Sequence, residues 1–180
     1  MNYDRLIIVA TVHHTGTHFI EEDILSDFDA RSLNYCGKIA GPSGKNIKIR
    51  IHLEPANTEN LTKWCSQCEV VVPMRHPISV AESWKARDKK MTQMTQEDLI
   101  IQWNILKSVV DPHHPIYLPL DVADRDNWLQ ALNAKTGLNI HTHWPVIMSC
   151  NKSAELNDDE RASVFEVMAD GFFDRFGYEV

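Results

Sequence analysis

The chain has 180 residues, of which 43% are hydrophobic and 24% charged, as is ordinary for one soluble globular domain. Its formal net charge of -7 argues against a broad nucleic-acid-binding surface, and no stretch approaches the roughly 20 apolar residues that span a bilayer. Four cysteines at this length do not suggest a disulfide scaffold, and the apolar run near the N-terminus is too short for a signal-peptide core. We therefore expect a cytoplasmic protein without membrane or nucleic-acid partners.

The chain begins with a strand-like segment followed by a tight turn. Residues 6–11 form a short run rich in Ile and Val, which predicts a buried parallel strand. After the turn, apolar residues at helical spacing predict a helix over 17–28. Residues 31–46 carry three glycines and a proline and predict an irregular segment, whereas 47–53 alternate strictly and predict a second strand.

The remaining segments continue the alternation of helices and strands. We expect a short helix over 58–65 capped by Asn57 or Thr58, a buried strand over 69–74, a helix from Pro77 to about Arg87, a helix over 95–110, a strand over 115–120, a helix over 126–135, and a last helix over 158–176 with Gly177 as its C-cap. This order predicts one α/β domain over residues 1–180, a three-layer sandwich around a central parallel sheet. Internal repeats and linkers are not evident.

The turn after the first strand has the outline of an anion-binding loop. The sequence "HHTGTHF" places Thr15, Gly16 and Thr17 between a buried strand and a helix. A glycine there lets backbone N–H groups turn inward, the helix N-terminus adds partial positive charge, and two hydroxyls are further donors. This pattern is compatible with a phosphate or sulfate site, although taken alone it favours a plain strand–turn–helix corner.

A nucleoside triphosphatase loop fits this segment poorly. That loop requires lysine followed by serine or threonine after its last glycine, in order to hold phosphate and magnesium. Thr17 and His18 occupy those two positions here. A Gly-Lys pair does occur later, in "GPSGKN", but an alternating strand follows it rather than a helix, so we interpret it as a loop.

A second group of candidate ligands follows the strand over 69–74. In "VVVPMRHPISVAESW" that strand delivers Arg75 to its carboxyl end, and the helix from Pro77 brings Ser83 back toward it. Ligands of open α/β sheets bind at this edge, and an arginine with a hydroxyl can grip a phosphate through charge-assisted hydrogen bonds. The alternatives are an ion pair of Arg75 with Glu82 or Asp88, and a plain helix-surface role for Ser83.

Taken together, "HTGTHF", "RIHLEP" and "RHPISVAES" resemble the PAPS-dependent sulfotransferases, where PAPS is 3'-phosphoadenosine 5'-phosphosulfate. The family's first motif runs K-S-G-T-T-W, its second strand ends K-T-H-L-P, and its third motif is R-x-P-x-x-x-x-x-S. Arg75, Pro77 and Ser83 match the third motif at its spacing. The segments "PIYLPLDVADRDNWLQALNAKTGL" and "FFDRFGYEV" also resemble family segments, so the resemblance covers nearly the whole chain.

The resemblance implies a P-loop-type, sulfotransferase-like fold that binds PAPS. Its reaction would move a sulfuryl group to the hydroxyl or amine of a small-molecule or glycan acceptor, with no metal required. The residues that would hold the 5'-phosphosulfate are Thr15, Gly16, Thr17 and His18, and those that would hold the 3'-phosphate are Arg75 and Ser83. Neither the acceptor nor the oligomeric state is encoded in a recognisable pattern; residues 34–44 and 89–96 are candidates for the rim of the acceptor site.

The resemblance also implies catalytic roles for His52 and His14, and Glu54 is a third candidate from its position on the strand. His52 stands where many family members place their catalytic base, and histidine titrates near pH 6.5, which suits that task. Taken without the neighbouring motifs, the residue is typical of an ordinary strand histidine. Glu54, two residues on, is expected to share the strand face of His52, where it would orient His52 or act as the base itself. His14 replaces the family lysine that neutralises the bridging oxygen, and Lys152 with Ser153 would stand in for a missing C-terminal R-K-G triplet.

Three other functions remain open. The missing lysine favours a sulfotransferase-like nucleotide-binding protein without catalysis. The turn at Gly16 also suits a small P-loop kinase, although its Lys-Ser/Thr pair is absent. A structural zinc site is the third alternative, suggested by the nine histidines and by the pair Cys65 and Cys68. Such a site needs four convergent ligands, usually in two short-spaced pairs, and the sequence has one such cysteine pair.

Overall fold

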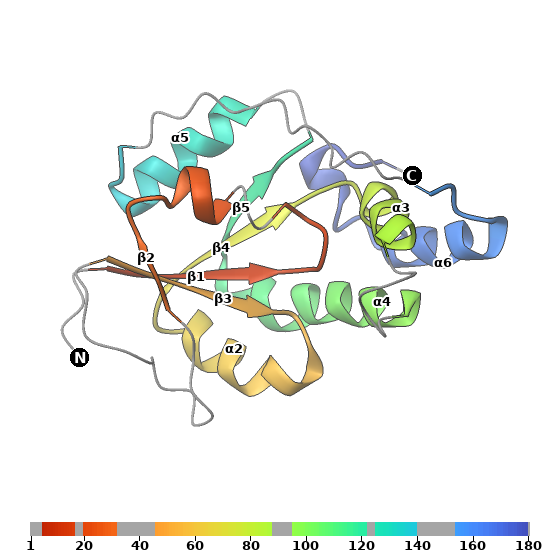
Figure 1. Cartoon of the computed structure of the whole chain (residues 1–180), viewed down its shortest axis with the longest axis horizontal. Coiled ribbons are helices and arrows are strands. Elements are labelled where there is room, and N and C mark those ends of the chain that lie inside the picture. Colours follow the sequence, from red (N-terminus) through yellow and green to blue (C-terminus); the bar gives the residue numbers. More distant parts are fainter. Residues whose placement is uncertain are drawn as a thin grey trace.

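The computed structural model describes residues 5–16, 20–31, 46–87, 95–121, 125–139 and 154–179. Five strands form one sheet in the order β2-β3-β1-β4-β5, and every neighbouring pair is parallel. Helices lie on both sides of this sheet (Figure 1), which confirms the predicted three-layer α/β sandwich. The strands are β1 (Arg5–Thr11), β2 (Asp29–Arg31), β3 (Asn46–His52), β4 (Glu69–Met74) and β5 (Ile116–Pro119).

The central strands owe their position to their apolar composition. In β1 the side chains from Ile7 to Thr11 are buried, and in β4 those from Val70 to Met74 are buried, as expected for strands covered on both faces. The register of β1 with β3 runs from Arg5 opposite Asn46 to Thr11 opposite His52. This register sets the position of His52 at the carboxyl edge of the sheet.

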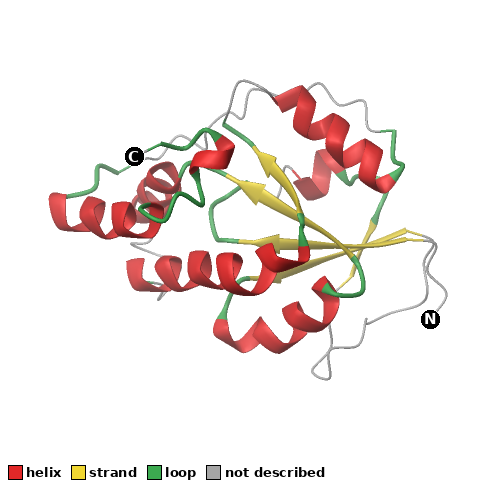
Figure 2. Ribbon diagram, turned by 180° about the vertical axis from the view of Figure 1, so that it is seen from behind, coloured by secondary structure: helices red, strands yellow, loops and turns green. Residues whose placement is uncertain are grey.

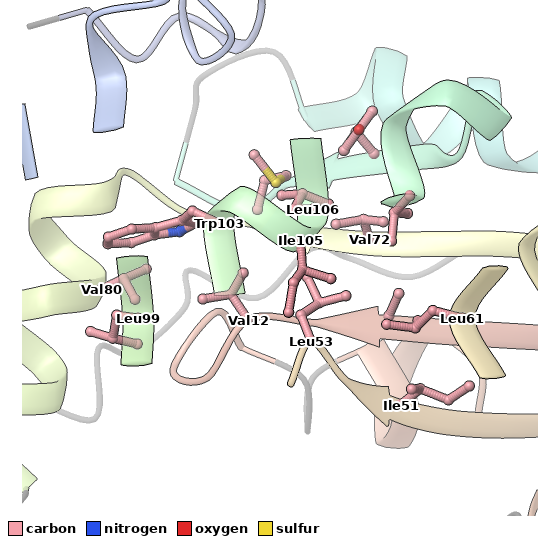
Figure 3. Close-up of a cluster of buried hydrophobic side chains, with 14 of the residues drawn as sticks. Val12, Ile51, Leu53, Leu61, Val72, Val80, Leu99, Trp103, Ile105 and Leu106 are labelled. Atoms are coloured by element: carbon pink, nitrogen blue, oxygen red, sulfur yellow. The ribbon is translucent and has the colours of Figure 1, made fainter. Parts of the chain in front are cut away.

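Two hydrophobic clusters cover the two faces. On one face, the helices α2 (Thr58–Cys65) and α4 (Gln96–Ile105) pack on the sheet, with α3 (Pro77–Arg87) and α6 (Asp158–Met168) extending this layer toward the carboxyl ends of the strands (Figure 1). On the other face lie the π-helix η1 (Ile20–Ile24) and α5 (Arg125–Thr136) (Figure 2). Val12, directly after β1, is buried in the first cluster with Leu53, Leu99 and Trp103, so the start of the following loop is anchored in the core (Figure 3).

Several predicted elements coincide with the observed ones. The helix predicted over 58–65 is α2, the strand predicted over 69–74 is β4, and the helix from Pro77 is α3. The N-cap of α2 is Asn57, but its side chain makes no capping bond and instead donates to the His52 carbonyl at 2.9 Å. By contrast α4 begins with a capping box in which Thr95 and Asp98 bond to each other's backbone N–H groups.

Two predicted helices are too long. Within the range 17–28 the described helix is η1, where the Leu25 N–H bonds to the Ile20 carbonyl at 2.8 Å, and a turn over residues 25–27 follows it. The helix predicted over 158–176 ends at Met168, because Gly171 adopts a left-handed φ of +73° soon afterwards. Gly177 ends the separate 3₁₀ helix η5 (Asp174–Phe176) rather than a long helix.

Two further differences concern short elements. The helix predicted over 95–110 consists of α4 followed by the π-helix η3 (Leu106–Val110), and η4 (Asp111–His113) leads from there toward β5. The edge strand β2 was not predicted, since three residues are too few to show a periodic pattern. The 3₁₀ helix η2 (Pro55–Asn57) follows β3 and does not alter the layering. Over the described ranges, no helix has the length and apolar character needed to cross a membrane.

Candidate functional site

The candidate site lies at the carboxyl edge of the sheet, between β1 and β4. After β1 the chain continues to β2 on one side of the sheet, and after β4 it continues to β5 on the other. Connections that leave two neighbouring strands in opposite directions create the switch point at which open α/β sheets bind ligands. The loop after β1 and Arg75 after β4 are both delivered to this point.

The loop after β1 is compact and depends on its glycine. Gly16 has φ of +87°, which strains any residue with a side chain, and a Cβ atom there would lie 2.5 Å from Cδ1 of Leu120, so that the Leu120 side chain would have to shift. His14 also adopts a left-handed φ, of +64°, a conformation that costs a non-glycine residue about 1–2 kcal/mol. Strain of this kind gathers at ligand sites. Thr15 and Gly16, two of the predicted phosphosulfate ligands, therefore lie on or directly after a left-handed backbone.

Thr15 contributes to this loop differently from its prediction as a hydroxyl donor. Its side chain is buried, and its Oγ1 donates a hydrogen bond to the Val12 carbonyl at 2.8 Å. The hydroxyl hydrogen therefore closes the turn itself. Any contact of Thr15 with an anion would come from its backbone N–H. Thr17 and His18, the other two predicted ligands of this loop, lie outside the described residues.

Arg75 lies against the first loop. Its Nη1 donates to the His14 carbonyl at 3.5 Å, and its Nε lies 3.9 Å from Oδ2 of Asp121. The ion pair thus joins Arg75 to Asp121, rather than to Glu82 as one alternative held; Asp88 lies outside the described residues. Sequence reasoning missed Asp121. The sequence did contain an indication of its role, because Asp121 comes after the strand β5 and so lies at the same edge of the sheet.

Asp121 also fastens the C-terminal segment beside Arg75. Its Oδ2 accepts the His76 N–H at 2.9 Å, and its Oδ1 accepts the Tyr178 hydroxyl at 2.6 Å. Burial, as the larger cause, and the nearby charge of Asp121, as the smaller one, raise the pKa of Tyr178 well above its usual range. The phenol therefore remains a hydrogen-bond donor at physiological pH. The Glu179 carbonyl lies 3.4 Å from Nε2 of His76. The tail is thereby held next to the guanidinium.

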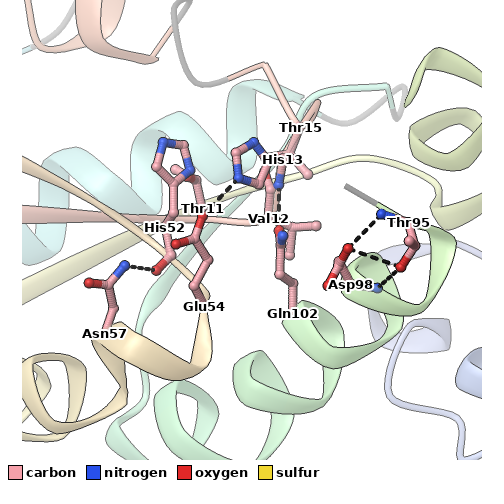
Figure 4. A network of polar contacts seen from close by, with 10 residues as sticks. All are labelled: Thr11, Val12, His13, Thr15, His52, Glu54, Asn57, Thr95, Asp98 and Gln102. Atoms are coloured by element: carbon pink, nitrogen blue, oxygen red, sulfur yellow. Dashed lines mark hydrogen bonds and ion pairs between the residues drawn. The ribbon is translucent and has the colours of Figure 1, made fainter. Parts of the chain in front are cut away.

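His52 lies at the end of β3, beside the end of β1. Its Nδ1 is 3.2 Å from Oγ1 of Thr11, the residue opposite it in the register. The His52 carbonyl accepts the Asn57 amide N–H. The His13 ring stacks on the His52 ring, with 4.3 Å between the ring centroids and 2° between the ring planes (Figure 4). The sequence prediction placed His52 at the site, and its stacked partner His13 was missed.

Glu54 contacts His13. The strand β3 ends at His52, so Glu54 does not share a strand face with it, as had been expected, and instead precedes η2 with extended backbone. One Glu54 oxygen lies 3.3 Å from Nε2 of His13 (Figure 4). The backbone N–H of His13 donates to the side-chain oxygen of Gln102, a buried residue of α4, at 2.9 Å. Gln102 gave no sequence signal, because a glutamine in an apolar helix has no characteristic spacing.

Ser83 is the other predicted ligand of the 3'-phosphate. It is buried on α3, and within the described ranges no hydrogen bond links it to Arg75. Lys152, Ser153, the acceptor-rim segment 34–44 and most of the segment 89–96 lie outside the described residues. Their predicted roles therefore stay predictions.

The cysteine pair lies away from this edge, at the end of α2 and just before β4. Both thiols are free, and burial raises the pKa of Cys65 to about 11 and that of Cys68 above its usual value, so both stay protonated at neutral pH. Among the residues that the structure describes, no group of three or more His, Cys, Asp or Glu side chains could hold a metal ion.

No family model matches the chain, and no curated protein matches it. Among solved structures, the chain is similar to the crystal structure of mouse sulfotransferase SULT7A1 complexed with PAP, with 13% sequence identity and a TM-score of 0.44. The similarity covers 91% of this chain and 63% of that chain, so this chain spans less than two thirds of that protein's length. A likeness of this size carries no inference about a reaction, and the parallel α/β architecture follows from the strand pairing itself.

Proposed function

We propose that this chain is a sulfotransferase that moves a sulfuryl group from PAPS to the hydroxyl or amine of a small-molecule or glycan acceptor. The observation that supports this most is the hydrogen bond from Arg75 to the His14 carbonyl, at 3.5 Å. It joins the two segments whose sequences resemble the nucleotide-binding motifs of that family. Both segments lie at the edge of the sheet where a bisphosphorylated nucleotide would bind.

The nucleotide would be held by local donors. Since the chain as a whole carries a formal charge of -7, long-range attraction does not favour an anion. Backbone N–H groups of Thr15, Gly16, Thr17 and His18 would surround the 5'-phosphosulfate. The Arg75 guanidinium, with one-fifth of its side chain exposed, would meet the 3'-phosphate together with Ser83.

The reaction would be an in-line displacement at sulfur. The acceptor oxygen or nitrogen forms a bond to sulfur while the bond from sulfur to the bridging oxygen of the 5'-phosphate breaks, and that oxygen keeps the electron pair. The acceptor proton passes to His52, and the products are the sulfated acceptor and 3',5'-diphosphoadenosine (PAP). Donors fixed around the non-bridging oxygens stabilise the charge that spreads over them, and protonated His14 would neutralise the leaving oxygen.

A second candidate is a nucleotide-binding protein that lacks this chemistry. It is favoured by histidine rather than lysine at position 14, where the backbone is left-handed. Such a protein would bind PAP with the same ligands but would transfer no sulfuryl group. The small P-loop kinase is the weaker alternative, and magnesium-dependent hydrolysis of ATP by the purified chain would favour it over both.

Calorimetry with PAP tests the binding half of the proposal. We expect saturable binding by the wild-type chain and a loss of about 10- to 100-fold in affinity for Arg75→Ala, since a hydrogen bond to a charged group is worth about 1.5–3 kcal/mol. Arg161→Ala, which removes an arginine from α6 outside the site, is the charge-matched control and should bind like the wild type. Absence of heat at millimolar PAP would refute the assignment.

Transfer from PAPS to a phenol such as 2-naphthol tests the chemical half. The proposed enzyme forms PAP and the aryl sulfate in equal amounts, and His52→Ala abolishes most of this turnover. Binding of PAP by the wild-type chain without transfer to phenol, amine or carbohydrate probes would favour the non-catalytic candidate.

A further inference from the structure

His13 is held more firmly than a residue of an ordinary turn. Its backbone N–H donates to Gln102 at 2.9 Å, its Nε2 lies 3.3 Å from a Glu54 oxygen, and its ring lies flat on His52. Burial does not explain these contacts, because 23% of the His13 side chain and 45% of the Glu54 side chain are exposed. Two other parts of the chain, α4 and the segment at the end of β3, converge on this one residue of the loop after β1 (Figure 4).

The contact with Glu54 selects one form of the His13 ring. An ionised carboxylate can only accept hydrogen bonds, so Nε2 of His13 must carry the hydrogen. In the neutral ring Nδ1 is then the bare nitrogen. Glu54 therefore fixes both the rotation of the ring about its bond to Cβ and its tautomer.

His13 in turn restricts the movement of the His52 ring. Thr11 meets the edge of that ring at Nδ1, at 3.2 Å, and the His13 ring covers its face at 4.3 Å with the planes nearly parallel. A ring held at one edge can still swing about its χ angles, whereas a ring held at an edge and a face cannot. Catalytic groups act efficiently when neighbouring side chains lock them within a fraction of an ångström.

We propose that His13 is a positioning residue for His52, and that Glu54 supports it by orienting the His13 ring. The chain of contacts runs from the Glu54 carboxylate through the His13 ring to the face of His52. This inference rests on the proposed function in one respect, that His52 accepts the proton of the acceptor. It changes the expected role of Glu54, which acts through His13 rather than directly on His52.

Three variants separate the parts of this arrangement. His13→Ala removes both the ring and the pair with Glu54. His13→Phe restores an aromatic face against His52 but cannot pair with Glu54. Glu54→Gln keeps the size of the side chain and loses its charge. Because all three retain the backbone N–H of residue 13, the bond to Gln102 is kept, and His113→Ala, at an exposed histidine of η4, is the control for loss of a histidine.

Nitrogen-15 spectra of the histidine rings, recorded at mildly alkaline pH, give a readout that needs no substrate. We expect His13 in the wild-type chain to show a protonated Nε2 and a bare Nδ1, and His52 to show one defined tautomer. In His13→Ala the two His52 nitrogens should move toward averaged shifts, and His13→Phe should restore the single tautomer. An unchanged His52 spectrum in His13→Ala would overturn the proposal.

Turnover of the phenol probe with PAPS gives the second readout. His13→Ala should lower kcat about tenfold or more, a loss typical of a misplaced catalytic group, with PAP affinity and KM for PAPS within threefold of wild type. His13→Phe should recover part of kcat, and Glu54→Gln should fall between wild type and His13→Ala. Full kcat in His13→Ala would contradict positioning. If the wild-type chain binds no PAP, the proposed function fails, and the ring spectra alone decide the role of His13.

Discussion

The two sides of the candidate site are built differently. On the side of β1 and β3, partly exposed titratable groups meet, because Glu54 lies 3.3 Å from His13 and the His13 ring stacks on His52. On the side of β4 and β5, a buried phenol and a backbone N–H bind Asp121 at 2.6 and 2.9 Å beside the Arg75 guanidinium. The first arrangement suits groups that exchange protons, and the second suits a fixed charge that holds an anion. The loop at Gly16 lies between them.

The largest expected effect comes from comparing His52→Asn with Arg75→Ala, which should separate proton transfer from nucleotide binding. His52→Asn should lower kcat for sulfuryl transfer by about 100-fold or more, since a general base typically contributes 10²–10⁴, while PAP affinity stays within threefold of wild type. Arg75→Ala should do the reverse, with weaker PAP binding as its main effect. Steady-state kinetics and calorimetry on the same preparations measure both. A fall in PAP affinity for His52→Asn as large as that for Arg75→Ala would erase the distinction between the two sides.

Substitution of the shared loop should damage both sides together. Gly16→Ala forces a side chain into a left-handed backbone and against Leu120, at 2.5 Å. We expect a loss of about 1–3 kcal/mol in unfolding free energy and a PAP affinity too weak to measure. Denaturant unfolding and calorimetry provide the two values. The double variant Gly16→Ala with Leu120→Ala removes the collision but not the φ strain, so PAP binding should stay impaired; recovery of wild-type affinity would show that packing alone requires the glycine.

The left-handed residue His14 allows backbone and side-chain roles to be told apart. Because φ at position 14 is +64°, glycine fits there without strain and alanine does not. The free energy of unfolding should therefore be about 1 kcal/mol higher for His14→Gly than for His14→Ala. Both variants lack the imidazole that would neutralise the leaving oxygen, so their turnover should be reduced alike. Wild-type turnover in His14→Gly would remove His14 from the mechanism and leave only its backbone in the site.

The smallest effect concerns the tether of the C-terminal segment. Tyr178→Phe loses the hydrogen bond to Asp121, which should lower the free energy of unfolding by about 1 kcal/mol, with PAP affinity within threefold of wild type. Since folding raises the pKa of Tyr178 above its ordinary value near 10, its contribution is complete below pH 10 and is lost as the pH rises further. Unfolding measured between pH 8 and 11 should therefore decline less steeply above pH 10 in Tyr178→Phe. An identical decline in both proteins would mean that the phenol is not buried against Asp121.

Sequence patterns predicted the parts of this molecule that depend on local order. The strand β4, the helix α3 and the position of Arg75 between them follow from a buried run, a proline and the next helical stretch. Contacts across the sheet could not be predicted in this way. The pairing of Thr11 with His52, and with it the stack on His13, depends on the register of two strands that are far apart in sequence.

The errors have similar physical causes. Helical spacing continued past Met168 in sequence, but a left-handed glycine at position 171 ends the helix. Asp121 and Tyr178 are ordinary in composition, and they become partners of the Arg75 side because the tail returns over the ends of β4 and β5. Local patterns therefore predicted candidate ligands at the ends of β1 and β4, and tertiary packing supplied the groups that hold these candidates in place.

A crystal structure of the chain with bound PAP would test the central claim most directly. We expect one nucleotide that bridges the two sides, with its 5'-phosphate against the backbone N–H groups around Gly16 and its 3'-phosphate against the Arg75 guanidinium. A nucleotide bound elsewhere on the sheet, or one whose phosphates avoid both the loop and Arg75, would contradict the assignment.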